Sequence, residues 1–366
     1  QLADLGNAYD DGALSNRNMV TNGSMAVAQR STSVAGIGAT GTAYHTIDRW
    51  QIETGNSGGR FTMSQSSDAP SGFGSSLKLD CTTAVTSIGT GEYLLLEYHL
   101  EGQDVQRIKT GTSDAEEVTI SFYVKANAAF NFVLEVRDNT NARNCSKLFS
   151  TTTGWNRVEL TYPADTTGEI VNSNASGIRL FFWIHAGSEY TGGTLNSSSF
   201  VSGVSGVNRA SGISSFYSST DNEFYLTGVQ MEVGDTATPF EHRSFGEELL
   251  VCQRYFAKSY PYDRYAGNTS SFGSIQTTFR ERDQGYGYTE KYDFPFPVRM
   301  RATPTITIYD FAGNSARCNY YIGTNLGNAN KVLNVSGMND RTFGGYDDRT
   351  TTNGGWACHY LADAEL

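Results

Sequence analysis

The chain has 366 residues and carries a formal net charge of −11 at pH 7, and only 18% of its residues are charged although 12% are aromatic. A chain of this length usually divides into two domains of roughly 100 to 250 residues. The negative charge would repel a phosphate backbone and no basic run reverses it locally, which excludes nucleic acid as a partner. Apolar runs such as 180–184 are far shorter than the roughly 20 residues that span a bilayer, which excludes membrane insertion.

The composition favours an all-β protein. Gly contributes 39 residues, and Ser, Thr and Asn are abundant where a helical protein would carry Lys and Glu. Residues 1–15 are acidic and show no apolar stripe long enough for a core. We therefore expect them to form an N-terminal arm or the end of a stalk.

From about residue 45 the hydrophobic period is two, which is typical of strands with one buried face. In 117–125, apolar residues occupy every even position from Val118 to Val124. The same alternation predicts further strands at 130–136, near residue 148, at 158–162 and at 178–184. Short strands without helical insertions favour an antiparallel sandwich over a parallel α/β sheet, and a jelly roll over 16–243 is the leading topology.

Two irregularities stand out in this region. In the last strand, Phe224 and Leu226 share one parity whereas Val229 and Met231 share the other, so we predict a β-bulge at Gly228 that restores one apolar face. The stretch 190–215 is rich in Gly, Ser and Asn and is predicted to be a long loop, of the kind that is often functional or mobile.

The period changes at Ser244. Ser244 and Glu247 match a capping box, and apolar residues then recur every three or four positions, which predicts a connecting helix over 244–258 with one face packed on a core. Strand signals return in 259–366, which we predict to be a smaller C-terminal β domain with strands at 272–279, 304–311, 331–335 and 355–362.

Motifs that would indicate enzyme chemistry occur in the wrong context. Gly36, Gly38 and Gly41 fit a dinucleotide-binding pattern, but an extended aromatic stretch follows them where a helix is required. The segment 55–59 fits a nucleophile elbow, but strand-like alternation follows, so we expect a hairpin turn. A pair of catalytic carboxylates cannot be recognised from sequence, so a glycan hydrolase stays open as the less favoured reading.

The metal-binding residue types are scattered. The five histidines occur singly, and the five cysteines are far apart without a C-x-x-C pair. We therefore expect no zinc site and no cofactor. The cysteines are expected to be free, mostly buried thiols in a protein that is assembled in a reducing cytoplasm. A structural calcium ion stays open, because the turn 138–141 and the acidic strand ends Glu232 and Asp235 offer hard oxygen ligands.

Aromatic placement is the best indication of a binding role. In the strand 178–184, Phe181 and Trp183 point away from the apolar face and need cover, either from a stacked glycan or, as we favour, from a neighbouring chain or the N-terminal arm. A second aromatic group lies in surroundings rich in Asp, Gly and Arg that suit recognition loops, although packing at hairpin tips stays open. This group comprises Tyr260, Tyr262, Tyr265, Tyr286, Tyr288 and Tyr292.

Three segments resemble tail fibre or receptor-binding proteins of tailed bacteriophages that are built on a jelly roll like that of carbohydrate-binding modules. The first is Asn-Met-Val-Thr-Asn-Gly-Ser-Met at 18–25 with Gln-Arg at 29–30 and Asp-Arg-Trp at 48–50. The second runs over 230–243 as Gln-Met-Glu-Val-Gly-Asp-Thr-Ala-Thr-Pro-Phe-Glu-His-Arg, followed by Cys-Gln-Arg-Tyr at 252–255. The third is Phe-Pro-Val-Arg-Met-Arg-Ala-Thr-Pro-Thr at 296–305, with Ala-Asp-Ala-Glu-Leu at the end of the chain.

The resemblance implies a virion protein, located in the tail and assembled in the host cytoplasm, that forms a homotrimer with other phage tail proteins as partners. It supplies no catalytic residues. We expect its motifs to be architectural: Asp48 and Arg49 as a charged pair beside Trp50, and Pro239 and Phe240 to end the last strand, with Phe240 closing the base of the sandwich.

The sequence therefore predicts a non-enzymatic tail fibre subunit whose loops bind host cell-surface polysaccharide, with avidity from several copies. The first alternative is a purely structural virion protein, such as a head decoration or a connector. A glycan hydrolase and a secreted bacterial adhesin are weaker alternatives.

Overall fold

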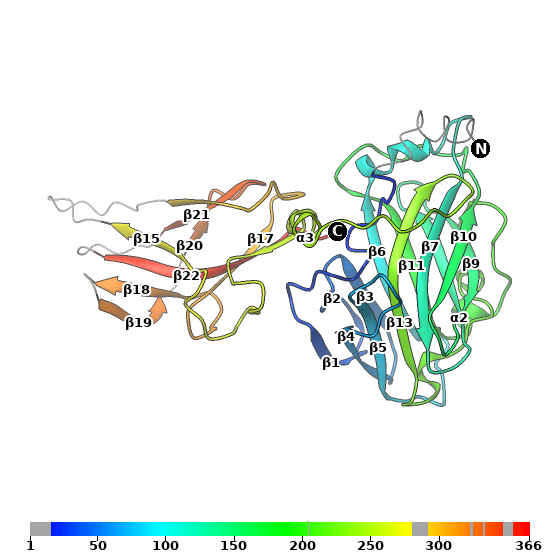
Figure 1. Ribbon diagram of the computed structural model, residues 1–366, viewed down its shortest axis with the longest axis horizontal. Coiled ribbons are helices and arrows are strands. Elements are labelled where there is room, and N and C mark those ends of the chain that lie inside the picture. The colour runs from blue at the N-terminus through cyan, green and yellow to red at the C-terminus, as the bar shows by residue number, and fades with distance from the viewer. Residues whose placement is uncertain (1–15, 204, 280–291, 323–324, 332–333, 347–353) are drawn as a thin grey trace. The chain divides into compact units, whose positions relative to one another are not determined.

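The computed structural model describes residues 16–203, 205–279, 292–322, 325–331, 334–346 and 354–366. These residues divide into two compact units, one up to Glu248 and one from Leu249. Both units are built almost entirely of antiparallel strands (Figure 1). The predicted all-β class, with a jelly-roll sandwich followed by a short helix and a smaller β domain, is confirmed.

The first unit is a sandwich of two antiparallel sheets. In its six-stranded sheet the order is β1 (Ser33–Ile37), β4 (Arg60–Ser66), β5 (Ser76–Thr83), β13 (Glu223–Val233), β7 (Val118–Ala126) and β10 (Asn156–Tyr162). In its seven-stranded sheet the order is β12 (Val201–Ser202), β9 (Arg143–Ser150), β8 (Asn131–Asp138), β11 (Ser176–Ala186), β6 (Tyr93–Glu101), β3 (Trp50–Gly55) and β2 (Gly41–Tyr44). The chain passes repeatedly from one sheet to the other, which is the connectivity of a jelly roll.

The core lies between the two sheets, where the predicted alternation places its apolar residues. Phe122 of β7 packs edge-on against Phe149 of β9 and Phe182 of β11, with ring centroids 5.1 and 5.3 Å apart. All three side chains are buried. Edge-to-face aromatic pairs add about 0.5–1.5 kcal/mol to the area that they bury, so these rings help to hold the two sheets together.

The predicted bulge in β13 is confirmed. The register between β13 and β7 shifts between Thr227 and Gln230, and Gly228 has a φ of 63°. An added Cβ at Gly228 would lie 2.7 Å from the ring of Phe73, so both the backbone angle and the space require glycine. Because of this extra residue, the side chains on both sides of the bulge face the same core.

The two glycine motifs connect strands. Residues 38–40 join β1 to β2, with no helix after them. The segment 56–59 joins β3 of the seven-stranded sheet to β4 of the six-stranded sheet. The predicted hairpin at this position is therefore wrong, because the two flanking strands belong to opposite sheets.

The connecting helix is shorter than predicted. The capping box forms, since Glu247 N donates to Ser244 Oγ at 3.3 Å and Ser244 N donates to Glu247 Oε2 at 2.9 Å. However, α3 covers only Phe245–Gln253, and Phe245 is 49% exposed where we expected it to pack on a core. Residues 256–258 form strand β14 (Phe256–Lys258) instead, because their backbone pairs with the last strand of the chain.

The second unit is arranged around β22 (Gly354–Asp363). The path β14–β22–β18 (Cys318–Ile322)–β19 (Asn325–Lys331) forms one sheet, and β15 (Ile275–Phe279) and β17 (Thr305–Tyr309) also pair with β22. A three-stranded sheet follows the order β16 (Tyr292–Pro295), β21 (Thr342–Tyr346) and β20 (Asn334–Ser336). The core of the second unit includes Met300, Ile308, Phe343 and Trp356. The other short helices among the described residues, all in the first unit, are η1 (Gly102–Asp104), η2 (Gln106–Ile108), α2 (Ser188–Thr191), η3 (Gly206–Asn208) and η4 (Phe216–Ser218).

Candidate functional site

The two faces of strand β11 carry different chemistry. Its even-numbered residues Leu180 and Phe182 point into the sandwich core, whereas Arg179, Phe181 and Trp183 point to the outer face of the seven-stranded sheet. Cross-strand pairing places Phe181 between Glu97 of β6 and Glu135 of β8. Buried carboxylates thus flank an aromatic ring on a face that most sandwiches leave to solvent.

The chain covers this outer face with its own loop. Two parts of the loop 187–215, residues 187–195 and 205–213, return to the outer face, where Tyr190, Leu195, Ala210 and Ile213 pack with Phe181 and Trp183. As a result, Phe181 is 3% exposed and Trp183 1% exposed. The expectation that a neighbouring chain or the N-terminal arm covers these rings is therefore wrong, because the predicted loop is long enough to turn back onto the sheet.

Glu135 anchors the loop to the sheet. Its carboxylate is fully buried and accepts Trp183 Nε1–H at 2.9 Å and two guanidinium N–H groups of Arg209, at 2.8 Å and 2.9 Å. The guanidinium carbon of Arg209 lies 4.9 Å from the centroid of the Trp183 ring. A bidentate, charge-assisted pair over an aromatic ring fixes the orientation of Arg209.

A second guanidinium group lies over the ring of Phe181. Arg179 donates to the fully buried Glu97, lies 3.7 Å from Glu53 and covers the Phe181 ring with its guanidinium carbon 4.5 Å from the centroid. Tyr93 Oη donates to Glu53 Oε1 at 2.9 Å. Burial of Glu53, together with its hydrogen bond to Glu97 and repulsion by that carboxylate, raises the pKa of Glu53 to about 7.

These side chains surround a hollow of about 250 Å³ on the outer face. It is lined by Tyr93, Tyr190, Glu53 and three arginines, Arg137, Arg179 and Arg209, and by the buried side chains of Leu95, Phe181 and Trp183. Tyr93 and Tyr190 remain half-buried, with ring centroids 5.5 Å apart. The hollow therefore combines aromatic rings with hydrogen-bonding groups, as small-ligand sites commonly do.

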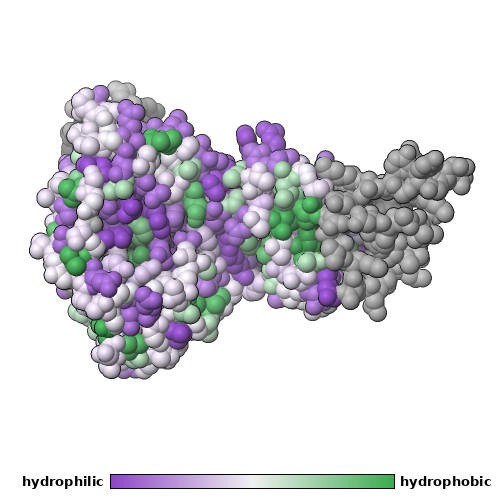
Figure 2. Space-filling view, turned by 180° about the vertical axis from the view of Figure 1, so that it is seen from behind, coloured by the Kyte–Doolittle hydropathy of each residue, from purple (hydrophilic) through white to green (hydrophobic). Residues whose placement is uncertain are grey.

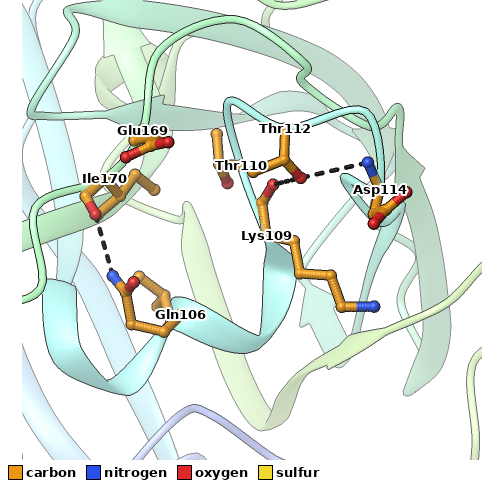
Figure 3. Close-up of a pocket in the computed structure, with 8 residues that line it drawn as sticks. Gln106, Lys109, Thr110, Thr112, Asp114, Glu169 and Ile170 are labelled. Carbon is orange, nitrogen blue, oxygen red and sulfur yellow. Dashed lines mark hydrogen bonds between the residues drawn. The ribbon is translucent and has the colours of Figure 1, made fainter.

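A different hollow, of about 410 Å³, lies beside η2 (Figure 3). No aromatic ring lines it. Two of the side chains drawn in Figure 3 are already engaged, since Gln106 Nε2 donates to the Ile170 carbonyl at 3.0 Å and Thr112 Oγ1 donates to the Lys109 carbonyl at 2.8 Å. This hollow offers little to orient a ligand. More generally, the face of the first unit visible in Figure 2 is mostly polar, with hydrophobic residues scattered over it.

The predicted tyrosine group is only partly described by the structure. Tyr260 is 3% exposed and stacks on His359 with ring centroids 3.8 Å apart, so its assignment to a recognition loop is wrong. Tyr262 is more exposed, and the ammonium of Lys258 lies 5.7 Å from its ring centroid and 5.2 Å from that of Tyr265. Tyr286, Tyr288 and the side chain of Tyr292 lie outside the described residues.

The first predicted architectural motif is buried at the edge of the core. Asp48 accepts Gln29 N–H at 2.9 Å, and Arg49 donates to the His99 carbonyl at 2.6 Å and lies 5.2 Å from the Tyr98 ring centroid. Trp50 is fully buried. The expected pairing of the two charged residues with each other stays a prediction, but their burial leaves them without access to a ligand.

The second architectural motif is placed differently from our expectation. Strand β13 ends at Val233, before Pro239, and the half-buried Phe240 packs against Phe73 on the outer face of the six-stranded sheet, with ring centroids 5.0 Å apart. Phe240 therefore does not close the base of the sandwich. Instead, buried Glu232 accepts Thr238 N–H at 2.9 Å, which ties the segment to β13.

The turn suggested as a calcium site uses its own oxygens. Asp138 accepts Asn141 N–H at 3.0 Å and Asn141 Nδ2–H at 2.7 Å. Within the described ranges, no three His, Cys, Asp or Glu side chains form a group that could hold a metal ion. The five cysteines are buried free thiols, and no described helix is long and apolar enough to cross a membrane.

Sequence reasoning identified Phe181 and Trp183 but missed the charged residues around them. The available signal was an acid inside an otherwise apolar strand, namely Glu97 in β6 and Glu135 in β8. A buried carboxylate needs a partner, so each of these positions pointed to a cation nearby. Which cation, and from which loop, depends on the tertiary structure.

No protein-family model and no curated protein matches this chain. Among solved structures, a family 4 carbohydrate-binding module is 13% identical over 51% of this chain and 87% of its own, with a TM-score of 0.29. A family 61 module with bound β-1,4-galactotriose (8% identical, 60% of this chain, 99% of its own) has a TM-score of 0.29. The xylan-binding CBM22-1 domain from Paenibacillus barcinonensis (12% identical, 60% and 96%) has a TM-score of 0.28. At these TM-scores the likeness identifies no family and decides no function.

Proposed function

We propose that this chain is a non-enzymatic glycan-binding protein that takes a sugar in the hollow on the outer face of its seven-stranded sheet. The observation that carries the proposal is the hollow itself, with the half-buried rings of Tyr93 and Tyr190 beside guanidinium and carboxylate groups. Sugars present flat apolar ring faces and many hydroxyl groups, so aromatic walls and charged hydrogen-bonding partners match both of their surfaces.

The positions of the carboxylates favour binding over hydrolysis. Two-carboxylate hydrolysis needs about 5 Å or more between the carboxyl groups, so that the scissile bond fits between them. Glu97 is fully buried and its carboxylate is held by Arg179, which also lies 3.7 Å from Glu53. A fully buried carboxylate cannot reach a scissile bond, so Glu53 and Glu97 do not form a catalytic pair of this kind.

Titration of the full chain against neutral and acidic oligosaccharides by calorimetry tests the proposal. We expect binding that weakens at least tenfold in Tyr190→Ala, which removes one wall of the hollow. Trp155→Ala is the matched control, because Trp155 is a half-buried ring that packs on Tyr225 of the six-stranded sheet instead. Absence of binding to every oligosaccharide, or equal losses in both variants, would argue against the proposal.

The setting that we propose is the tail of a phage particle, where a homotrimeric fibre would present the hollow to host polysaccharide. This part rests on the sequence resemblance alone. Three copies per fibre would raise a weak single-site affinity by orders of magnitude. Light scattering tests the assembly, since a stable 39.9 kDa monomer at micromolar concentration would contradict it. Retention on intact host cells would separate an attachment protein from a purely structural virion component.

A further inference from the structure

Three guanidinium groups line the hollow together with Phe181, but among the described residues only two of them form an ion pair with a carboxylate. Arg179 pairs with Glu97 and Arg209 pairs with Glu135. Arg137 makes no ion pair or hydrogen bond with any residue that the structure describes, and its Nε is buried without an acceptor. The Nε of Arg179 is also buried without a partner.

The position of Arg137 is unfavourable for the stability of the protein when no ligand is bound. Arg137 on β8 lies directly opposite Arg179 on β11, and like charges in that position destabilise a sheet. Burial, and then the charge of Arg209, lower the pKa of Arg137 from its usual value. Glu135 and Asp138 attract the guanidinium and offset part of this shift, but neither forms an ion pair with it. An arginine stays charged near neutral pH, so Arg137 is a partly desolvated cation without an ion-pair partner among the described residues.

We infer that the hollow recognises a carboxylate-bearing sugar residue, whose carboxylate ion-pairs with Arg137 while the sugar ring lies against Tyr93 and Tyr190. This inference rests on the proposed function and names its ligand class. A planar carboxylate matches the two parallel N–H donors of a guanidinium, which makes such pairs both strong and directional.

The surroundings favour a single charged sugar over a larger anion. The hollow, at about 250 Å³, is smaller than the roughly 300–1,000 Å³ of sites for drug-sized ligands, so it suits about one sugar ring. Arg179 and Arg209 are held by buried glutamates and by the Phe181 ring, with guanidinium carbons 4.5 and 5.3 Å from its centroid. Their geometry is therefore set before the ligand arrives, which lowers the entropic cost of binding.

The balance of charge inside the hollow also favours an anion. Three arginines face three glutamates, Glu53, Glu97 and Glu135, but Glu97 and Glu135 are fully buried beneath their partners. Glu53 is about half protonated at neutral pH because its pKa is about 7. An acidic ligand thus meets a local excess of positive charge on a chain whose net charge is −11.

The test compares an acidic sugar with its neutral ester on the full chain. Trigalacturonate and its methyl ester are titrated by calorimetry at 0.15 M salt, together with inorganic sulfate and a neutral oligosaccharide panel. The variant is Arg137→Gln, which removes no side-chain hydrogen bond to any residue that the structure describes. The matched control is Lys109→Gln, which removes a cation beside the other hollow, where Lys109 pairs with Glu116.

We expect the acid to bind at least tenfold more tightly than the ester, and Arg137→Gln to abolish that difference while Lys109→Gln keeps it. Equal binding of acid and ester overturns the inference but leaves the proposed function intact. Sulfate binding as tightly as the acidic sugar overturns it in favour of a free-anion site. Failure of every sugar, neutral or acidic, overturns the proposed function as well. Circular dichroism of each variant shows that a loss of binding is not a loss of folding.

Discussion

Strand β11 buries apolar side chains on both of its faces, but the two faces are stabilised in different ways. The inner face packs Leu180 and Phe182 among other apolar side chains of the sandwich core. The outer face places Phe181 and Trp183 under guanidinium groups that are held by buried glutamates. Burial alone therefore does not distinguish a structural face from a candidate binding face. The two differ in what covers them, which is apolar side chains on one face and ion-paired arginines on the other.

This difference has an energetic consequence. Apolar packing stabilises the inner face through area and shape, so a change there costs folding free energy and leaves no charge unpaired. On the outer face, the attraction within the buried ion pairs offsets at most part of the free energy that their desolvation costs. These pairs therefore mainly fix the geometry of the side chains. The inner face thus contributes stability, and the outer face contributes the arrangement that a ligand could use.

The largest expected effect lies on the inner face. Phe182→Ala removes a ring that contacts Trp50, Phe122 and Phe149. We expect the free energy of unfolding of the first unit to fall by about 3–5 kcal/mol, because a large cavity replaces the ring. Urea denaturation followed by tryptophan fluorescence measures the change, and a loss under 1 kcal/mol would show that the core is not where the stability lies.

A smaller loss is expected on the outer face for Glu135→Ala. This substitution leaves Arg209 and the Trp183 N–H without their acceptor, and we expect a cost of about 3 kcal/mol together with loosening of the loop 187–215. The matched control is Glu159→Ala, whose pair with Arg157 is solvent-exposed and is expected to matter by less than about 1 kcal/mol. Limited proteolysis within the loop distinguishes loosening from global unfolding, and equal resistance in both variants would contradict the anchoring role.

The next effect concerns the pH dependence of binding. Burial and the neighbouring Glu97 raise the pKa of Glu53 to about 7, and Tyr93, Tyr190 and Arg179 also surround it. As the pH falls from 8 to 6, Glu53 gains a proton and the hollow becomes more positive, whereas a sugar carboxylate stays ionised. Affinity for an acidic sugar should therefore rise by about threefold.

Glu53→Gln should flatten that dependence at the high-affinity level. Calorimetric titration of trigalacturonate at pH 6, 7 and 8 measures both proteins. A pH profile that persists unchanged in the variant would assign the titration to another group.

The smallest expected effect is the stability of Arg137→Gln. Because Arg137 has no partner among the described residues and faces Arg179, we expect the free energy of unfolding to change by less than about 0.5 kcal/mol, or to rise slightly. Thermal denaturation checks this. A clear destabilisation would show that Arg137 supports the fold, and would weaken its assignment to a ligand.

Local patterns predicted much of the fold. The alternation in 117–125 became β7, the change of parity at Gly228 became a bulge, and Ser244 with Glu247 capped α3. These features depend on neighbours within a few residues, so the sequence contains the whole signal. The end of α3 was not predictable in this way, because residues 256–258 leave the helical pattern to pair with β22, about 100 positions later.

For the candidate site, the sequence by itself determined which residues of β11 need cover, because side chains alternate strictly along a strand. The tertiary structure decided what the cover is: the loop 187–215 brings Tyr190 and Arg209 onto Phe181 and Trp183, and strand pairing brings Arg137 next to Arg179. The physical reason is range. Alternation and capping act within one strand or one helical turn, whereas an ion pair or a hollow forms only where distant segments meet, and that meeting is set by the packing of the whole sandwich.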